Sequence, residues 1–265
     1  MLRGCPHLSH LITFLDSCLQ KHHPLFFGPT ASHPFLKIKH SKIMHDNLWG
    51  TNRFSWRELA IIDSPILQRL RYIHQTGLAF QVYMAAHHTR FEHSIGVATI
   101  ASRIFDALHN RCRNIFKDIA RILGKTLNYE EYISKLKQEL RIAALLHDIG
   151  HSIHSHTSEL VFSELNLIKL ASNELSEFTG KTKGAAEVIA FCITLSESIR
   201  NLLSRAKDKL MDGEAHDVYY GDISINNIAL MILGRAEHPL LQFMGDIISS
   251  DPSSTVSFLK YSDIK

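Results

Sequence analysis

The sequence predicts an all-α fold, and three observations support this prediction. Apolar residues recur every three or four positions through most of the 265-residue chain, which is the spacing of one face of an α-helix. Strand-like alternation of apolar and polar residues is almost absent, and residues 81–84 are the one short candidate. Hydrophobic residues make up 45% and charged residues 21% of the chain, as in globular proteins.

Residues 1–41 show no clear apolar period and contain several prolines and histidines. We predict an irregular N-terminal extension over this stretch. The apolar patch at 11–15 is interrupted by Asp16, and no small-residue cleavage site follows, so a signal peptide is not expected. No apolar run approaches the ~20 residues that span a bilayer, so we expect no membrane partner.

The first two predicted helices cover residues 65–75 and 91–108. Ser64 is a preferred N-cap residue, and Pro65 is a preferred first residue of a helix. Gly77 follows the first apolar stripe as a stop signal. The second segment carries two adjoining apolar stripes, which predict a largely buried helix.

A third helix is predicted from Asn128 to Gly150. Asn128 and Glu131 have the spacing of a capping box, and a clean apolar stripe follows. Residues 185–203 and 223–233 also have the helical period. These segments complete the all-α prediction.

Composition excludes several function classes. The net charge of +3 is too small to indicate a nucleic-acid partner. The four cysteines form no CxxC pair, which argues against a disulfide framework and a thiolate zinc site and favours a reducing, cytoplasmic compartment. The unusual count is 18 histidines, because histidine is the commonest metal ligand and the usual proton carrier near neutral pH.

The pair His147-Asp148 directly follows a run of apolar residues at the end of the third predicted helix. An ionisable pair in that place is costly unless its charge is compensated. Adjacent helical residues point about 100° apart, so both side chains can reach one metal ion, and nitrogen plus oxygen ligands suit Mn, Fe or Zn. A helix C-terminus capped by His147 is the alternative. Gly150 lets the chain turn back, and three further histidines favour the metal site: His151, His154 and His156.

A second polar cluster, residues 87–94, opens the helix predicted at 91–108. His93 is flanked by the apolar stripes, so we expect it to face inward. A lone inward histidine is more often a hydrogen-bonded core residue than a ligand. Arg90 is unusual at a helix start, because that end prefers anions. Its planar fork and the free backbone N–H groups together form a phosphate site, which indicates a phosphate-bearing substrate.

The runs DSPILQRLRYIHQTG, HTRFEHSIGV and LLHDIGHSIHSHT occur in this order. They resemble the HD-domain phosphohydrolases. More narrowly, they are similar to the deoxynucleoside-triphosphate triphosphohydrolases, which include bacterial dGTPase-like enzymes and the animal enzyme that pairs a sterile-alpha-motif with an HD domain. The resemblance implies a helical HD domain over residues 42–250 with a metal site between its helices, after the extension at 1–41 and before a divergent tail at 251–265.

The resemblance also implies roles for single residues. His93, His147 and Asp148 match three of the family's four metal ligands. His151 and His156 match catalytic histidines at the α-phosphate, with His156 as the proton donor. The implied reaction converts a dGTP-like deoxynucleoside triphosphate and water into a deoxynucleoside and triphosphate. The implied metals are Mn, Fe or Zn at the HD site and Mg with the nucleotide, and the implied assembly is a homo-oligomer.

Further residues match substrate-binding positions. Gln75 matches a glutamine that reads the deoxyribose, and Arg90 matches a residue that holds substrate phosphate. Lys181 stands where the family often has a histidine; lysine can meet a phosphate as a point charge. Three residues match a regulatory guanine-nucleotide pocket, with an N-cap and a solvated helix face as the alternative: Asp63, Gln68 and Arg71.

The tail departs from the family pattern after residue 250. There the family supplies its fourth metal ligand, but Thr255 occupies about that place, with Asp251 and Asp263 as candidate replacements. We therefore expect a chain shortened at its C-terminus. One alternative function is a catalytically impaired relative that binds metal or nucleotide or partners a full-length relative. Another is hydrolysis of a different phosphoester. The run at 68–77 argues against this alternative, because it resembles the deoxynucleoside-triphosphate branch of the family.

Overall fold

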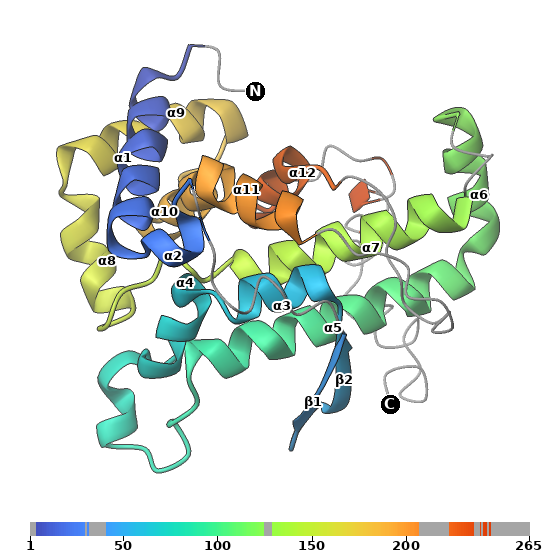
Figure 1. The fold of residues 1–265 in the computed structure, drawn as a ribbon, viewed down its shortest axis with the longest axis horizontal. Coiled ribbons are helices and arrows are strands. Elements are labelled where there is room, and N and C mark those ends of the chain that lie inside the picture. Colours follow the sequence, from blue (N-terminus) through green and yellow to red (C-terminus); the bar gives the residue numbers. More distant parts are fainter. Residues whose placement is uncertain are drawn as a thin grey trace.

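The fold is described from a computed structural model, which describes residues 4–29, 31, 41–124, 129–206, 223–235, 239, 241–242 and 244 (Figure 1). Apart from one small hairpin, the regular structure in these residues is helical, which confirms the all-α prediction. The strands are β1 (Lys42–Asp46) and β2 (Gly50–Phe54), and the 3-10 turns are η2 (Arg69–Tyr72) and η3 (Gly77–Gln81). The helices are α1 (Pro6–His22), α2 (Pro24–Phe27), α3 (Trp56–Ile62), α4 (Pro65–Gln68), α5 (Arg90–Arg111), α6 (Arg113–Ile122), α7 (Tyr129–Leu146), α8 (His156–Ser163), α9 (Asn166–Thr179), α10 (Ala185–Leu195), α11 (Glu197–Arg205) and α12 (Ile225–Ile232).

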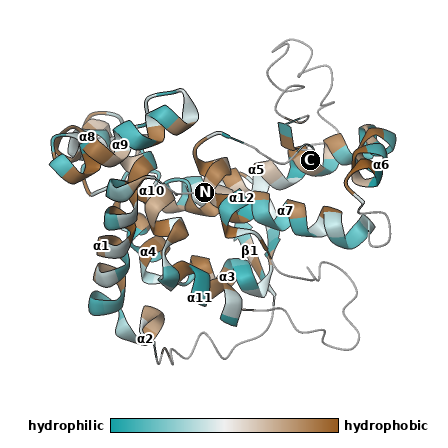
Figure 2. Cartoon of the chain, turned by 90° about the horizontal axis from the view of Figure 1, so that it is seen from above, coloured by the Kyte–Doolittle hydropathy of each residue, from teal (hydrophilic) through white to brown (hydrophobic). Residues whose placement is uncertain are grey.

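The long helices α5 and α7 pack side by side and run in opposite directions through the middle of the molecule (Figure 1). The N-terminus of α5 therefore lies beside the C-terminus of α7. Helices α6 and α8 lie at opposite ends of the molecule, and individual helices carry both hydrophilic and hydrophobic residues (Figure 2). This pattern is expected where each helix buries one face.

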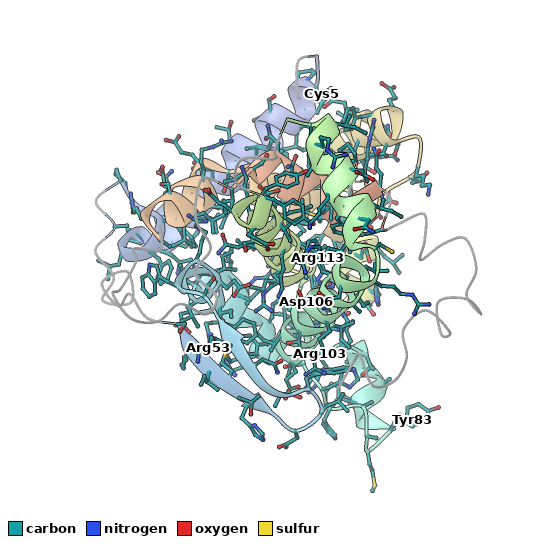
Figure 3. The ribbon with its side chains drawn as sticks, turned by 90° about the vertical axis from the view of Figure 1, so that its right-hand side faces the viewer. Cys5, Arg53, Tyr83, Arg103, Asp106 and Arg113 are labelled. Carbon is teal, nitrogen blue, oxygen red and sulfur yellow. The ribbon has the colours of Figure 1, made fainter. Side chains whose placement is uncertain are left out.

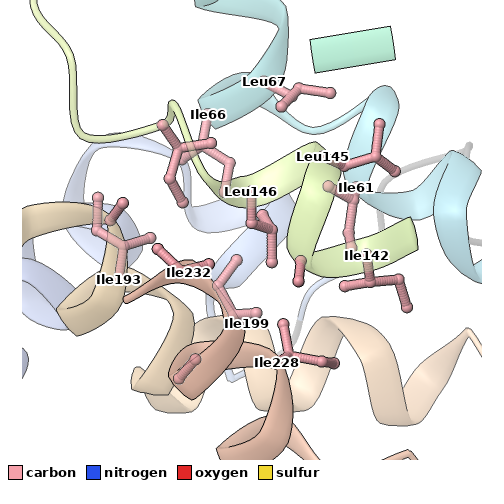
Figure 4. Close-up of a cluster of buried hydrophobic side chains, with 14 of the residues drawn as sticks. Ile61, Ile66, Leu67, Ile142, Leu145, Leu146, Ile193, Ile199, Ile228 and Ile232 are labelled. Atoms are coloured by element: carbon pink, nitrogen blue, oxygen red, sulfur yellow. The ribbon is translucent and has the colours of Figure 1, made fainter. Parts of the chain in front are cut away.

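The main core contains buried residues of α7 together with residues of α3, α4, α10, α11 and α12. Figure 4 shows buried side chains of this core, including Ile61, Leu145, Ile199 and Ile228, which are fully buried. A second apolar cluster around Phe105 and Phe116 joins the C-terminal half of α5 and the N-terminal half of α7 to α6. Helix α7 takes part in both clusters, and its last turn, residues 142–146, lies in the main core.

The hairpin β1–β2 is antiparallel, with Met44 opposite Asn52. Its turn is closed by Asp46, whose Oδ1 accepts the backbone N–H groups of Leu48 (2.8 Å) and Trp49 (2.7 Å). The prediction of a strand at 81–84 is wrong, because that segment ends η3 and continues into a turn. The hairpin was not predicted from the sequence.

The irregular extension predicted for residues 1–41 is wrong for the part that forms α1 and α2. Leu8 and Leu11 bury one face of α1, which packs on α9 and α10. The carboxylate of Glu174 on α9 accepts the N–H groups of His7 (3.1 Å) and Leu8 (2.9 Å) at the start of α1. The cap of this helix thus comes from a distant part of the sequence. The domain boundaries at 42 and 250 stay a prediction.

Two predicted helices are divided in the structure. The segment 65–75 leaves the α-helix at Gln68, continues as η2 and becomes extended at Ile73, whose carbonyl accepts the N–H of Arg90 (2.8 Å). The segment 185–203 breaks at Ser196, which is extended and caps α11 by accepting the N–H of Ile199 (3.4 Å). Asn128, the predicted cap of α7, lies outside the described residues.

No helix among the described residues is long and apolar enough to cross a membrane.

Candidate metal centre

The start of α5 places His93 in the first turn of a firmly capped helix. The N-cap is Thr89, whose hydroxyl accepts the N–H of Glu92 (3.3 Å), while the Glu92 carboxylate accepts the N–H of Thr89 (2.7 Å). This capping box satisfies two backbone N–H groups that a helix start otherwise leaves open. Thr89 is also bridged to His74, which ties the preceding loop to this helix start.

At the end of α7 the chain turns sharply and presents His147 and Asp148. Gly150 lets this turn approach α10 closely, because a Cβ there would lie 1.9 Å from the carbonyl oxygen of Ala186 on α10. A side chain at this position would therefore push the loop away from α10. The close approach fixes the loop against the start of α10.

His93, His147 and Asp148 come together between the two helices. One ligand atom of each lies within 4.8 Å of the others. Nε2 of His93 is 3.9 Å from Oδ2 of Asp148, and Nε2 of His147 is 3.4 Å from Oδ1. Asp148 is buried, and the two histidines are partly exposed, so the group is open on one side.

The hydrogen bonds of His147 suit a metal ligand. Its Nδ1 lies 2.7 Å from the carbonyl oxygen of Ala144. A carbonyl can only accept, so Nδ1 carries the proton and Nε2 keeps its lone pair for an ion. Two imidazole nitrogens and a carboxylate form a donor set that fits a divalent transition metal. The residues present therefore fit the metal that the sequence predicts.

A second group lies next to the first. His151, His156 and Glu159 also bring one candidate ligand atom each within 4.8 Å of the others. His151 Nε2 is 3.5 Å from Asp148 Oδ1, so it contacts the first group. The exposed His156 approaches the Glu159 carboxylate with its Nδ1 at 3.2 Å. The structure thus brings the predicted ligands and the predicted catalytic histidines into one centre.

Arg90 lies beneath this centre and joins its parts. Its guanidinium donates to Asp148 Oδ2 at 2.6 Å and to the hydroxyl of Ser155, and it approaches His156 Nε2 at 3.5 Å. The Arg90 side chain is only 1% exposed. In this arrangement Arg90 orients Asp148 from below.

The electrostatics of the centre keep its ligands in metal-binding protonation states. Burial lowers the pKa of His93, and burial together with the charge of Arg90 lowers the pKa of His151 to about 4. Burial alone would raise the pKa of Asp148, but the charges of His147, Arg90 and His151 outweigh it and the pKa is lowered. At neutral pH His93 and His151 are therefore neutral and Asp148 is ionised, as metal binding requires.

Several buried polar atoms of the described part of the chain have no hydrogen-bond partner, among them Nε of Arg90, and two of them belong to residues predicted to meet the substrate. These two atoms are Nδ1 of His151 and Oε1 of Gln75. Buried polar atoms are normally satisfied, so these two are candidates to meet a ligand. Gln75 is held nearby, because its N–H donates to the His88 carbonyl (3.1 Å) and Gly77 lies beside Ser155.

The other predicted positions lie apart from this centre. Lys181 is exposed in a bend where its backbone contacts Thr179, and within the described residues no hydrogen bond joins it to the histidines. Gln68 and Arg71 contact each other, Nε to Oε1 at 2.8 Å, and Asp63 ends α3 nearby. The regulatory role of these three stays a prediction. Thr255, Asp251 and Asp263 lie outside the described residues.

The sequence model of the HD domain matches residues 90–223. The chain belongs to the HD-domain family. The match begins at Arg90 and includes every residue of both histidine groups. HD domains bind divalent metals, which agrees with the donor set of this centre, and the family is one of hydrolases.

Curated relatives match over a limited part of their length. An uncharacterized protein of Methanocaldococcus jannaschii is 40% identical over 45% of this chain and 21% of its own. The deoxynucleoside triphosphate triphosphohydrolase SAMHD1 of Xenopus laevis is 36% identical over 43% of this chain and 16% of its own, and that of Bos taurus is 35% identical over 43% and 17%. The matched segments thus span about a fifth of these relatives. The crystal structure of a hypothetical protein from Aquifex aeolicus is 27% identical, covers 84% of this chain and 48% of that chain, and has a TM-score of 0.47.

Sequence reasoning missed two residues of this HD centre. Glu159 contacts His156 and accepts the N–H of Ala186 (3.3 Å), which links α8 to α10. Its spacing of three residues from His156 on one helix was the available signal. Ser155 holds Arg90 and has a positive φ of 52°. Nothing in a serine at that position signals such a backbone conformation.

Proposed function

We propose that the chain hydrolyses deoxynucleoside triphosphates of the dGTP type to a deoxynucleoside and triphosphate. The observation that carries this proposal is the contact of the His93–His147–Asp148 group with His151 and, through Arg90, with His156. A metal-binding group beside histidines that can move a proton is what phosphoester hydrolysis needs. The SAMHD1 relatives support the choice of substrate class by their name.

In this proposal His93, His147 and Asp148 hold the ion, which is Mn, Fe or Zn, while Mg accompanies the nucleotide. When bound there, the ion would supply charge neutralisation for the phosphates and a lowered pKa for a water molecule. Arg90 keeps the Asp148 carboxylate ionised and aimed at the ion, and Gln75 meets the deoxyribose with its unsatisfied oxygen. Lys181 stays a weaker candidate for phosphate contact, because it is exposed and lies apart from the histidines.

The proton needed by the leaving group comes from His156. Water attacks the α-phosphorus and releases a proton to solvent, the bond from phosphorus to the 5′-oxygen breaks, and that oxygen takes a proton from the His156 ring. Solvent then reprotonates His156. The Glu159 carboxylate lies 3.2 Å from His156 Nδ1, which orients the ring for this transfer. His151 is buried and neutral at neutral pH, so it acts by donating or accepting a hydrogen bond at the phosphate.

The test is product formation from dGTP with Mn and Mg, with deoxyguanosine and triphosphate quantified separately. We expect His147→Ala to abolish turnover and His156→Gln to lower kcat by about 10²–10⁴-fold. The exposed His10 on α1 offers a matched control, since His10→Ala should leave turnover unchanged. If folded wild-type protein forms no product from any deoxynucleoside triphosphate, the proposal fails.

A substrate panel separates the alternatives. Faster turnover of monophosphates than of triphosphates identifies an HD phosphohydrolase with another phosphoester substrate. Metal-dependent nucleotide binding without turnover identifies a catalytically impaired relative. A cytoplasmic location and a homo-oligomeric state stay expectations, and the oligomer is checked by light scattering.

A further inference from the structure

A polar cavity of about 210 Å³ lies between the hairpin and helices α5 and α7, away from the histidine groups. Its walls carry four cationic side chains, one from β2, one from α5 and two from α7: Arg53, Arg103, Lys137 and Arg141. Among the described residues that line it there is no carboxylate. Figure 3 labels Arg53 on the hairpin and Arg103 on α5, both on the face turned toward the viewer.

The four cations are held in place by contacts behind or beside the cavity. Arg141 pairs with the buried Glu58, and Lys137 Nζ pairs with Asp106 at 2.8 Å. Arg103 Nη2 donates to the carbonyl oxygen of Trp49 at 2.6 Å. These contacts fix the direction of the side chains, so a ligand would meet an arrangement that is already ordered.

Arg53 approaches the cavity from the hairpin. It is exposed, and its Nη1 contacts the neutral hydroxyl of Ser41 at 3.2 Å. Asp106 and Glu58 neutralise Lys137 and Arg141. The lining has four cationic side chains against these two carboxylates, so it is positively charged overall. Neutral donors complete the lining, among them Asn52, Ser55 and Ser102. Guanidinium forks combined with hydroxyl and amide donors are the groups that bind phosphate oxygens.

The size of the cavity limits the ligand. Pockets for drug-sized molecules have about 300–1,000 Å³, whereas this cavity has about 210 Å³. A chain of phosphate groups suits this volume better than a whole nucleotide with its base enclosed. We propose that the cavity binds a linear oligophosphate, the class that includes inorganic triphosphate and the phosphate tail of a nucleoside triphosphate.

The oligophosphate site is separate from the HD centre. Arg103 follows His93 by ten residues on α5, which corresponds to about 15 Å along a helix axis. No residue of the cavity belongs to either histidine group. The oligophosphate site therefore does not depend on the proposed hydrolysis, and it can be tested in protein that contains no metal.

The test is calorimetric titration of the full chain in EDTA with inorganic triphosphate at low salt. We expect the double variant Arg53→Gln/Arg103→Gln to weaken the affinity at least tenfold. The matched control Arg113→Gln/Arg121→Gln removes the same charge from two exposed arginines near the α6 end and should change the affinity less than twofold. Equal weakening in both double variants would overturn the proposal, because it would show an effect of overall charge.

Arg103→Gln also removes the hydrogen bond to Trp49, so circular dichroism must show that the variant is folded. If it is not, Arg53→Gln/Lys137→Gln replaces it, and the same tenfold loss is expected. Two further titrations distinguish the ligand source. Equal affinity for triphosphate and dGTP, with none for deoxyguanosine, supports recognition of the phosphate chain. Binding of single-stranded oligonucleotides alone, without triphosphate binding, overturns the proposal in favour of a nucleic-acid site.

Discussion

Arg90 and Asp148 form a buried ion pair beneath the metal ligands, with 2.6 Å between Nη1 and Oδ2 and side-chain exposures of 1% and 8%. The pair joins the first residue of α5 to the loop that follows α7. The guanidinium of Arg90 balances the negative charge of Asp148, which is buried and therefore not solvated by water. The geometry of the centre therefore depends on a residue that the sequence analysis assigned to substrate phosphate.

Arg90→Met should destabilise the metal-free protein by roughly 3–5 kcal/mol, because it leaves Asp148 buried without its partner. Urea unfolding measures the free energy. Arg90→Lys keeps the charge and should recover part of the loss. Arg121→Met on the exposed face of α6 is the control and should cost less than about 0.5 kcal/mol. Equal costs for the two methionine variants would contradict this account.

The stability of the metal-free protein should fall as the pH is lowered from 6.5 to about 4. In that window the unfolded chain protonates His151, whereas burial keeps the folded side chain neutral, since its pKa falls from 6.5 to about 4. The unfolded state then binds more protons, so the free energy of unfolding decreases as the pH falls, by on the order of 3 kcal/mol for the full shift.

His151→Gln should flatten this pH dependence, because glutamine does not titrate. Chemical denaturation at several pH values in EDTA gives the two slopes. His93 shifts in the same direction, so some dependence remains in the variant. Identical slopes for wild type and variant would show that His151 has an ordinary pKa.

Manganese should raise the melting temperature of the wild-type protein, and EDTA should reverse the effect. An ion that binds only the folded state at a concentration 100 times its Kd adds about 2.7 kcal/mol. His147→Ala should abolish the shift, while His10→Ala should keep it. Thermal denaturation with and without the ion makes the comparison, and a full shift in the His147 variant would exclude it as a ligand.

Ser155 combines a positive φ of 52° with a hydrogen bond to Arg90. Ser155→Ala keeps the backbone strain and leaves a buried guanidinium donor unsatisfied, which costs about 1–3 kcal/mol. Ser155→Gly loses the same hydrogen bond but relieves the strain. We therefore expect the order of stability wild type, glycine variant, alanine variant. An alanine variant more stable than the glycine variant would mean that the backbone is not strained.

The sequence predicted the elements whose signals are local. The apolar stripe of α7 and the polar start of α5 placed His93 at the start of one long helix and His147 and Asp148 at the end of another, and the packing of those helices joins them. Lys181 was chosen by position along the chain, and the bend at that point leaves it exposed.

Two of the features that differ from the prediction depend on contacts between distant residues. Helix α1 is capped by Glu174. The helix predicted at 65–75 is extended at Ile73, where the carbonyl oxygen accepts a hydrogen bond from the N–H of Arg90. The hairpin lacks regular alternation of apolar residues, so no period-two signal marks it. In the two helical segments the tertiary partner decides the local structure, whereas the hairpin pairs residues close in the sequence.

The antiparallel packing of α5 and α7 has a consequence for refolding. An ion held by His93 and His147 connects the two ends of the segment 94–146, and on a partly folded chain it acts as a reversible cross-link. Cross-links reduce the conformations that an unfolded chain can sample. Adding the ion early or late during refolding should therefore change the order in which α5 and α7 come into contact.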